Sequence, residues 1–206
     1  MDGAEIGQAR MHVLAAVGAG GAPVGDRTRL QNILFLYSRD VPQTGPLFGY
    51  RPHTLGPHSE IVDRALEDLV RDWMVSGSYS AALTGAAGPG FEEAARGIGE
   101  RGMRLLAASK EFIGRMGHNQ MHAYIYSKYP GMSKASIRYR DIMARQEEYI
   151  VDLANDRIIS TRCAARLLDM EYIDFLPRVD ALGISEAGGF PTRSPPPTTS
   201  TGRATK

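Results

Sequence analysis

The stretch from residue 147 to residue 184 constrains the fold most, because its apolar residues recur at helical spacing in three short blocks. It reads EEYIVDLANDRIISTRCAARLLDMEYIDFLPRVDALGI. The spacing predicts three helices, at about 147–155, 161–168 and 171–182. Ser160 is placed to cap the second of them by accepting a backbone N–H. Short helices joined by tight turns are typical of a helix-turn-helix, so we expect residues 146–184 to form such a domain.

The sequence of residues 1–117 predicts helices and strands in a different order. Apolar stripes indicate four helices, at about 4–17, 27–39, 60–74 and 99–116. Between the last two, the runs 75–83 and 91–98 resemble strands, joined by the glycine-rich loop 84–90. Three helices, a hairpin and a helix follow one another in a winged helix; any other small α+β domain is the alternative. The predicted fold class is therefore mainly α (α+β): an N-terminal winged helix with a two-stranded hairpin and a C-terminal three-helix helix-turn-helix.

Composition excludes several classes of protein. With 43% hydrophobic and 23% charged residues, the 206-residue chain has the composition of a folded domain. Its apolar runs are shorter than the roughly 20 residues that cross a bilayer, so we expect no membrane association and a cytoplasmic location. Cys163 is the single cysteine, which excludes an internal disulfide and a multi-cysteine zinc site. Residues 185–206, rich in Pro, Thr, Ser and Gly, are expected to be a disordered tail.

Basic residues gather in the second half of the chain and make DNA a candidate partner. The connecting segment 118–145 is predicted to be helical; it contains four tyrosines, five Lys or Arg and one acid, Asp141. The candidate nucleic-acid-binding residues come from this segment and the domain that follows it: Lys128, Lys134, Arg138, Arg140, Arg157, Arg162, Arg166 and Arg178.

The third helix of the expected helix-turn-helix fits base reading poorly. Its exposed positions include Glu171, Asp174 and Asp180, and its one basic residue is Arg178. Base edges are most often read by Arg, Asn or Gln. Pro177 adds a second difficulty, because proline inside a helix removes a backbone hydrogen bond at a cost of roughly 3 kcal/mol. We expect a kink there, or a helix that restarts at Pro177.

Two parts of the chain resemble known groups of proteins. The first extends from Arg27 to Leu106 and contains RLQNILFLYSRD, LGPHS and RALEDLVRDWMV. It resembles prokaryotic winged-helix proteins with an LQKLLFL helix, a YGPYS turn and a DLDxLVxxGLI helix. The second, residues 147–184, contains DRIISTRCAARLLDM and EYIDFLPRVDALGI. It resembles the UPF0175 proteins, a group of predicted antitoxins, although Asp169 stands where that group often has glycine.

The resemblances imply a non-enzymatic, antitoxin-like DNA-binding regulator without a cofactor or metal. They imply DNA as its partner and make a homodimer a candidate assembly. The alternative is a protein-interaction module that binds a toxin or another partner without reading DNA. Other candidate sites have simpler interpretations. His118 and His122 lie one helical turn apart but lack further metal ligands, His53 and His58 flank a Gly-Pro turn, and Cys163 is expected to be a small packing residue.

Overall fold

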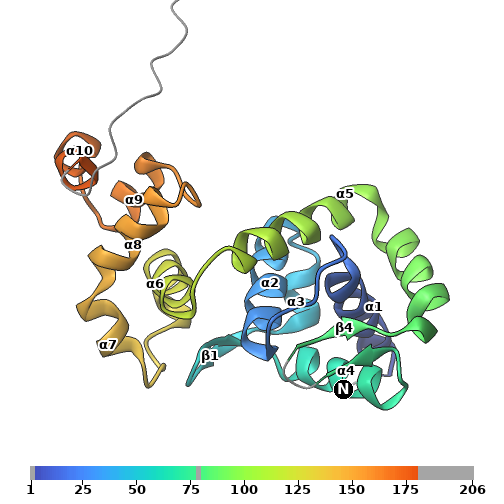
Figure 1. The fold of residues 1–206 in the computed structure, drawn as a ribbon. Coiled ribbons are helices and arrows are strands. Elements are labelled where there is room, and N and C mark those ends of the chain that lie inside the picture. Colours follow the sequence, from blue (N-terminus) through green and yellow to red (C-terminus); the bar gives the residue numbers. More distant parts are fainter. Residues whose placement is uncertain (1–2, 78–79, 181–206) are drawn as a thin grey trace, which may run out of the picture.

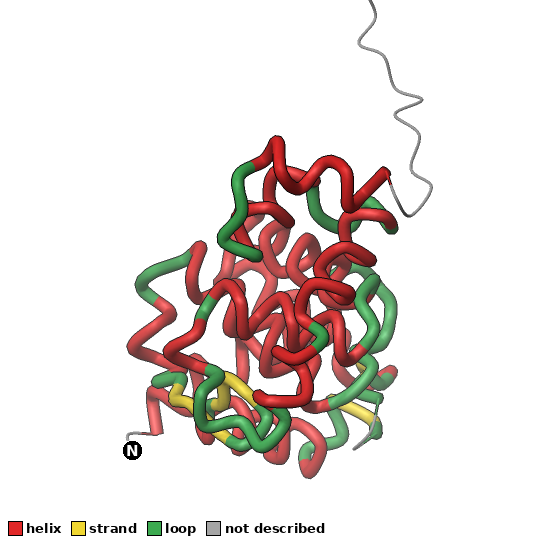
Figure 2. Tube along the Cα trace, turned by 90° about the vertical axis from the view of Figure 1, so that its left-hand side faces the viewer, coloured by secondary structure: helices red, strands yellow, loops and turns green. Residues whose placement is uncertain are grey.

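The computed structural model describes residues 3–77 and 80–180, and it is mainly helical, with 70% helix and two small antiparallel sheets. This confirms the predicted class. In chain order the elements are α1 (Gly3–Gly18), α2 (Arg27–Asp40), α3 (Thr44–Phe48), β1 (Arg51–His53), β2 (Gly56–His58), α4 (Glu60–Arg71), β3 (Val75–Ser76), β4 (Ala82–Leu83), α5 (Gly88–Gly114), α6 (His118–Lys128), α7 (Tyr139–Ala144), α8 (Gln146–Asn155), α9 (Thr161–Leu167) and α10 (Tyr172–Asp180). Short 3-10 turns lie at Gly85–Ala87 and Pro130–Met132. Figure 2 shows how small a part of the chain the strands form.

The elements α1–α5, here called the N-terminal lobe, pack around α1. This helix contacts α2, α4 and α5, and its residues Val13, Ala15 and Ala16 are completely buried. Side chains cap the start of two helices. An Asp26 carboxylate oxygen accepts from the Arg29 backbone N–H at 2.9 Å at the start of α2, and the Ser59 hydroxyl accepts from the Val62 backbone N–H at 3.2 Å at the start of α4. The capping residues therefore determine where α2 and α4 begin, and burial of their apolar side chains against α1 stabilises both helices.

The predicted hairpin is wrong in its second strand. β3 pairs with β4, so both strands lie inside the run 75–83, and the residues 91–98 belong to α5. The reason is visible in the spacing, because Phe91, Ala94 and Ile98 recur at helical intervals rather than alternating. Gly99, at φ 76°, then kinks α5 where the sequence predicts a helix start.

A second hairpin, β1–β2, forms where the sequence indicates a Gly-Pro turn between His53 and His58. Gly56 and Pro57 lie within β2, and the turn falls at Thr54 and Leu55. The carbonyl of Thr54 accepts hydrogen bonds from the Ile137 backbone N–H at 3.1 Å and the Ser136 hydroxyl at 3.0 Å. This hairpin therefore ties the N-terminal lobe to the chain that follows α6 (Figure 1).

The elements α6–α10, here called the C-terminal lobe, form a second helical group. α6 lies against α7, α8 and α9, and α9 packs against α10. The three helices α8, α9 and α10 closely match the ranges predicted for the helix-turn-helix, and Phe175 and Ile150 are completely buried among them. Helix α10 continues through Pro177, so it does not restart there. The predicted end of this helix and the predicted tail lie outside the described residues.

Three helices end at a non-glycine residue with positive φ: α4 at Trp73 (57°), α8 at Arg157 (54°) and α9 at Asp169 (54°). Each end forms the paired hydrogen bonds of a Schellman motif; after α9, the Met170 N–H reaches the Ala165 carbonyl at 3.0 Å and the Asp169 N–H reaches the Arg166 carbonyl at 3.3 Å. Asp169 therefore adopts the left-handed conformation that glycine favours, at the position where the UPF0175 proteins often have glycine.

Candidate nucleic-acid interface

Three of the predicted DNA-binding residues converge on one surface of the C-terminal lobe. Lys128 ends α6, and Arg162 and Arg166 lie one turn apart on α9. They line a shallow hollow of about 450 Å³ together with Ser127, Ser160, Cys163 and Leu167. We call Lys128, Arg162 and Arg166 the basic cluster. None of the described residues lining this hollow is acidic, so the hollow offers a phosphate both positive charge and the hydroxyls of its serines.

Packing between helices brings these residues together. The side chain of Gln146, at the start of α8, donates to the Ser127 hydroxyl at 2.8 Å and to the Leu167 carbonyl at 3.1 Å. One amide thus links the end of α6 to the end of α9. The Ser160 hydroxyl accepts from the Cys163 backbone N–H at 3.2 Å and confirms the predicted cap of α9. Cys163 is half-buried at the edge of the hollow.

Aromatic rings orient two of the three cations. The Lys128 ammonium donates to the Tyr124 hydroxyl at 2.8 Å and lies 5.2 Å from the centre of that ring. Burial raises the pKa of Tyr124, with further contributions from Cys163 and Asp40, so the phenol stays neutral beside the lysine. The Arg162 guanidinium lies 5.4 Å from the ring centre of Tyr172 on α10. Neither ring neutralises its cation, so both charges stay available to an anion.

Arg166 is the member of the basic cluster for which the described residues provide no aromatic contact. Its side chain is exposed, and within the described part of the chain no carboxylate lies within salt-bridge distance of it. An unpaired surface arginine keeps all five N–H donors for a ligand.

Two other predicted contacts are engaged within the molecule. The Arg178 guanidinium on α10 forms an ion pair with Glu147 on α8. Arg138 is half-buried and donates to the Asn119 side-chain oxygen at 2.8 Å. Both arginines therefore hold helices together in this conformation, and a phosphate would have to compete with these contacts.

The last three predicted contacts lie on exposed turns and short helices. Lys134 and Arg140 lie between α6 and α8, and Arg157 lies at the left-handed residue that ends α8. All three side chains are exposed and lie outside the hollow.

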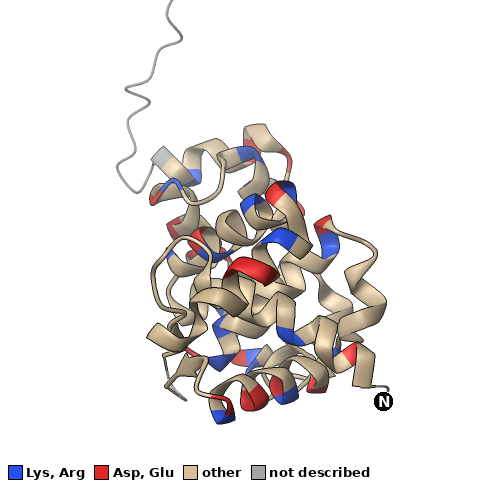
Figure 3. Cartoon of the chain, turned by 90° about the vertical axis from the view of Figure 1, so that its right-hand side faces the viewer, with Lys and Arg blue, Asp and Glu red and all other residues tan. Residues whose placement is uncertain are grey.

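The first turn of α10 presents acidic and apolar side chains instead of base-reading ones. Glu171, Tyr172, Ile173 and Asp174 are all exposed, and Ile173 is 71% exposed. Helix α4, the third helix of the predicted winged helix, is also acidic overall, because it carries four acids and two arginines. Figure 3 shows the acidic positions of α4 along the lower edge of the molecule. In both helices acids outnumber the arginines, which are the base-reading side chains that they carry.

Sequence reasoning did not single out the residues that orient the basic cluster. Tyr124 lies four residues before Lys128 on α6, which is a helical spacing that predicts contact and was available from the sequence. The contact of Arg162 with Tyr172, and the bridge made by Gln146, depend on how α8, α9 and α10 pack. No local pattern shows those contacts.

The histidine pairs occupy structural positions. His118 lies 3.3 Å from an Asp26 carboxylate oxygen, and His122 is buried. Burial, with help from Arg138 and His118, lowers the pKa of His122 to about 4. The rings of His53 and His58 stack across β1–β2 with centroids 4.5 Å apart. Among residues 3–77 and 80–180, His, Cys, Asp and Glu side chains form no group of three or more that could hold a metal ion.

Comparisons with known proteins identify no relative of this chain. The chain matches no family model, no curated protein and no solved structure. The two resemblances in the sequence therefore stay predictions. Within the described residues, none of the helices has the length and apolar character needed to cross a membrane.

Proposed function

We propose that this protein is a cytoplasmic, antitoxin-like DNA-binding regulator that contacts the DNA backbone through the basic cluster on α6 and α9. The observation that carries the proposal is the convergence of Lys128, Arg162 and Arg166 around one hollow without an acidic lining residue. Lys and Arg on phosphates supply most of the sequence-independent affinity for DNA. The hydroxyls of Ser127 and Ser160 at the same place are further phosphate ligands.

In this proposal the C-terminal lobe holds the DNA backbone and does not read bases through the first turn of α10. Glu171 and Asp174 at that turn would repel phosphates, and Arg178 is paired with Glu147. Binding is therefore expected to depend strongly on salt and weakly on sequence.

A salt titration with matched variants tests the proposal. Duplex DNA from the region upstream of the gene is titrated with the full chain at several salt concentrations. Arg162→Ala and Arg166→Ala are each expected to weaken binding to all duplexes and to reduce the slope of log K against log salt by about 1. Arg96→Ala is the control, because Arg96 lies exposed on α5 in the other lobe. Absence of salt-dependent binding by the wild-type protein would refute the proposal.

A protein-interaction module is the second candidate, and the surface of α10 favours it. Tyr172 and Ile173 expose apolar area between the acids Glu171 and Asp174, a combination suited to a basic partner with an apolar anchor. Asp174→Arg and Ile173→Ser are expected to abolish co-purification of such a partner and to leave DNA affinity equal or higher. A partner retained by both variants would exclude this surface.

A further inference from the structure

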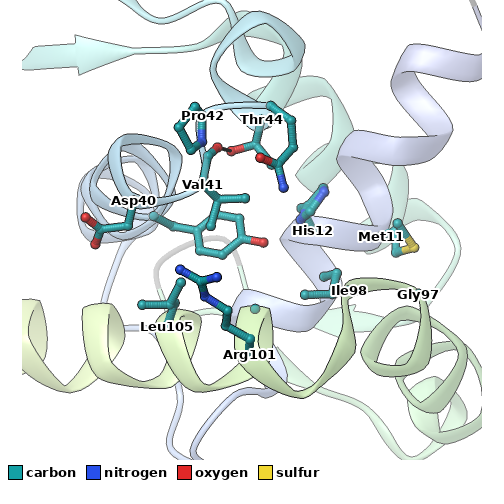
Figure 4. A pocket seen from close by; sticks show the side chains of 13 residues that line it. Met11, His12, Asp40, Val41, Pro42, Thr44, Gly97, Ile98, Arg101 and Leu105 are labelled. Atoms are coloured by element: carbon teal, nitrogen blue, oxygen red, sulfur yellow. Dashed lines mark hydrogen bonds between the residues drawn. The ribbon is translucent and has the colours of Figure 1, made fainter.

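The N-terminal lobe contains a cavity of about 420 Å³ that shares no lining residue with the hollow of the basic cluster. It lies between α1, the end of α2, the start of α3 and the kinked part of α5 (Figure 4). This volume falls within the range of small-molecule sites, roughly 300–1,000 Å³. We call it the α1–α5 cavity.

Two glycines of α5 border the cavity. Gly97 and Gly102 line the cavity on either side of the kink at Gly99. A Cβ added at Gly97 would come within 2.8 Å of the Met11 sulfur, and one added at Gly102 within 3.2 Å of the Tyr37 hydroxyl. The kink and the two missing side chains therefore keep α5 close to α1 and α2 without filling the cavity.

Three polar side chains of the cavity have unused hydrogen-bonding capacity. Within the described part of the chain, Arg101 has no carboxylate within salt-bridge distance and the Tyr37 hydroxyl has no hydrogen-bond partner. Burial lowers the pKa of His12, so its imidazole is neutral at pH 7. The Nδ1 atom of His12 is buried without a partner, which leaves Nε2 as the ring nitrogen that can meet a bound molecule.

The charges around the cavity favour an anion. Figure 4 shows Arg101, from α5, and His12, from α1, on two sides of the space, whereas the carboxylate of Asp40 points away. Burial raises the pKa of Tyr37, so its hydroxyl keeps its proton and can donate. The guanidinium and two neutral donors can thus satisfy a carboxylate, which only accepts hydrogen bonds. Five apolar side chains also line the cavity, namely Met11, Val41, Pro42, Ile98 and Leu105, and Gln43 and Thr44 add two polar ones.

We propose that the α1–α5 cavity binds a small organic carboxylate, with its anionic group on Arg101 and its apolar body against Met11, Ile98 and Leu105. Charge-assisted hydrogen bonds to the guanidinium select the acid over its neutral amide. The side chains of Met11, Ile98 and Leu105 favour a ligand with a compact aromatic or aliphatic body.

The test follows the Met11 methyl group by NMR in the full chain. Methionine methyls are labelled with carbon-13, and the Met11 signal is assigned as the one lost in Met11→Leu. The protein is titrated with benzoate, indole-3-acetate and octanoate, and with the amide of each. At least one acid is expected to shift the Met11 signal and to bind about tenfold or more tightly than its amide.

Two arginine variants on one helix complete the test. Arg101→Gln is expected to lower the affinity for the acid to that for its amide. Arg104→Gln is the matched control, since Arg104 is exposed on the same helix, lies outside the cavity and contacts Glu100; it should bind the acid as the wild-type protein does. The proposal is overturned if no acid shifts the Met11 signal, if acids and amides bind equally, or if Arg101→Gln keeps the wild-type affinity.

Discussion

Acid should destabilise this protein through His122, which lies on α6 beside the junction of the two lobes. Its side chain is 3% exposed and packs against the Tyr126 ring, with centroids 5.3 Å apart. Burial is the largest cause that lowers its pKa to about 4, against 6.5 for an unperturbed histidine, and the charges of Arg138 and His118 act in the same direction. The folded state therefore prefers the neutral imidazole.

The sign and size of the effect follow from proton linkage. Between pH 6.5 and pH 4 the unfolded chain binds a proton at His122 that the folded chain refuses, so stability is complete above pH 6.5 and is lost as the pH falls toward 4. One pKa unit corresponds to about 1.4 kcal/mol, so His122 should cost about 2 kcal/mol of unfolding free energy by pH 4.5.

Denaturant unfolding at pH 7 and at pH 4.5 measures this loss. His122→Phe keeps an aromatic ring of similar size and removes the titration, so it should lose about 2 kcal/mol less than the wild-type protein over this interval. His53→Gln is the control, because His53 is exposed. Equal losses for the wild-type protein and His122→Phe would refute the reasoning.

Two further predictions concern stability. Lys110 is buried and donates to the carbonyls of Val17 and Ala19, and burial lowers its pKa to about 8. From pH 8 to pH 10 the wild-type unfolding free energy should therefore rise by roughly 1–2 kcal/mol relative to Lys110→Met; parallel pH curves would contradict this. Asp169 has a positive φ, so Asp169→Gly should raise the unfolding free energy of the protein by about 0.5–1 kcal/mol. Asp156→Gly is the control and should not stabilise, because Asp156 has φ −73°. Thermal unfolding compares the two variants, and an Asp169→Gly variant less stable than the wild-type protein would contradict the assignment of strain.

Much of the helical framework could be predicted from the sequence, because amphipathic spacing and capping residues act locally. The stripe Leu30, Ile33, Leu34 and Tyr37 is buried in α2. Asp26, Ser59 and Ser160 cap the helices that they precede. The same local rules placed α8, α9 and α10, because the joints between them consist of a serine cap and left-handed residues.

The errors arose where short segments depend on distant partners. The strands β3 and β4 are two residues each, and Val24, far away in sequence, donates to the Ala81 carbonyl at 2.8 Å to extend that hairpin. The hairpin β1–β2 depends on contacts of Thr54 with residues 136 and 137. Segments this short carry too few apolar residues to show a period, so tertiary contacts decide their structure.

The candidate site was predicted in part. The list of basic residues came from charge alone, and it could not separate Lys128, Arg162 and Arg166, which share one hollow, from Arg138 and Arg178, which hold other side chains. That separation requires knowing how α6 lies against α9. The α1–α5 cavity had no sequence signal either, because its lining comes from four elements.

The most direct test of the proposed function compares the salt dependence of DNA binding in the wild-type protein and in a variant with Lys128, Arg162 and Arg166 all changed to alanine. Each phosphate contact contributes about 0.9 to the slope of log K against log salt on duplex DNA. The triple variant should therefore bind more weakly at every salt concentration, with a slope smaller by about 2–3. An unchanged slope with intact folding would show that the basic cluster does not contact DNA.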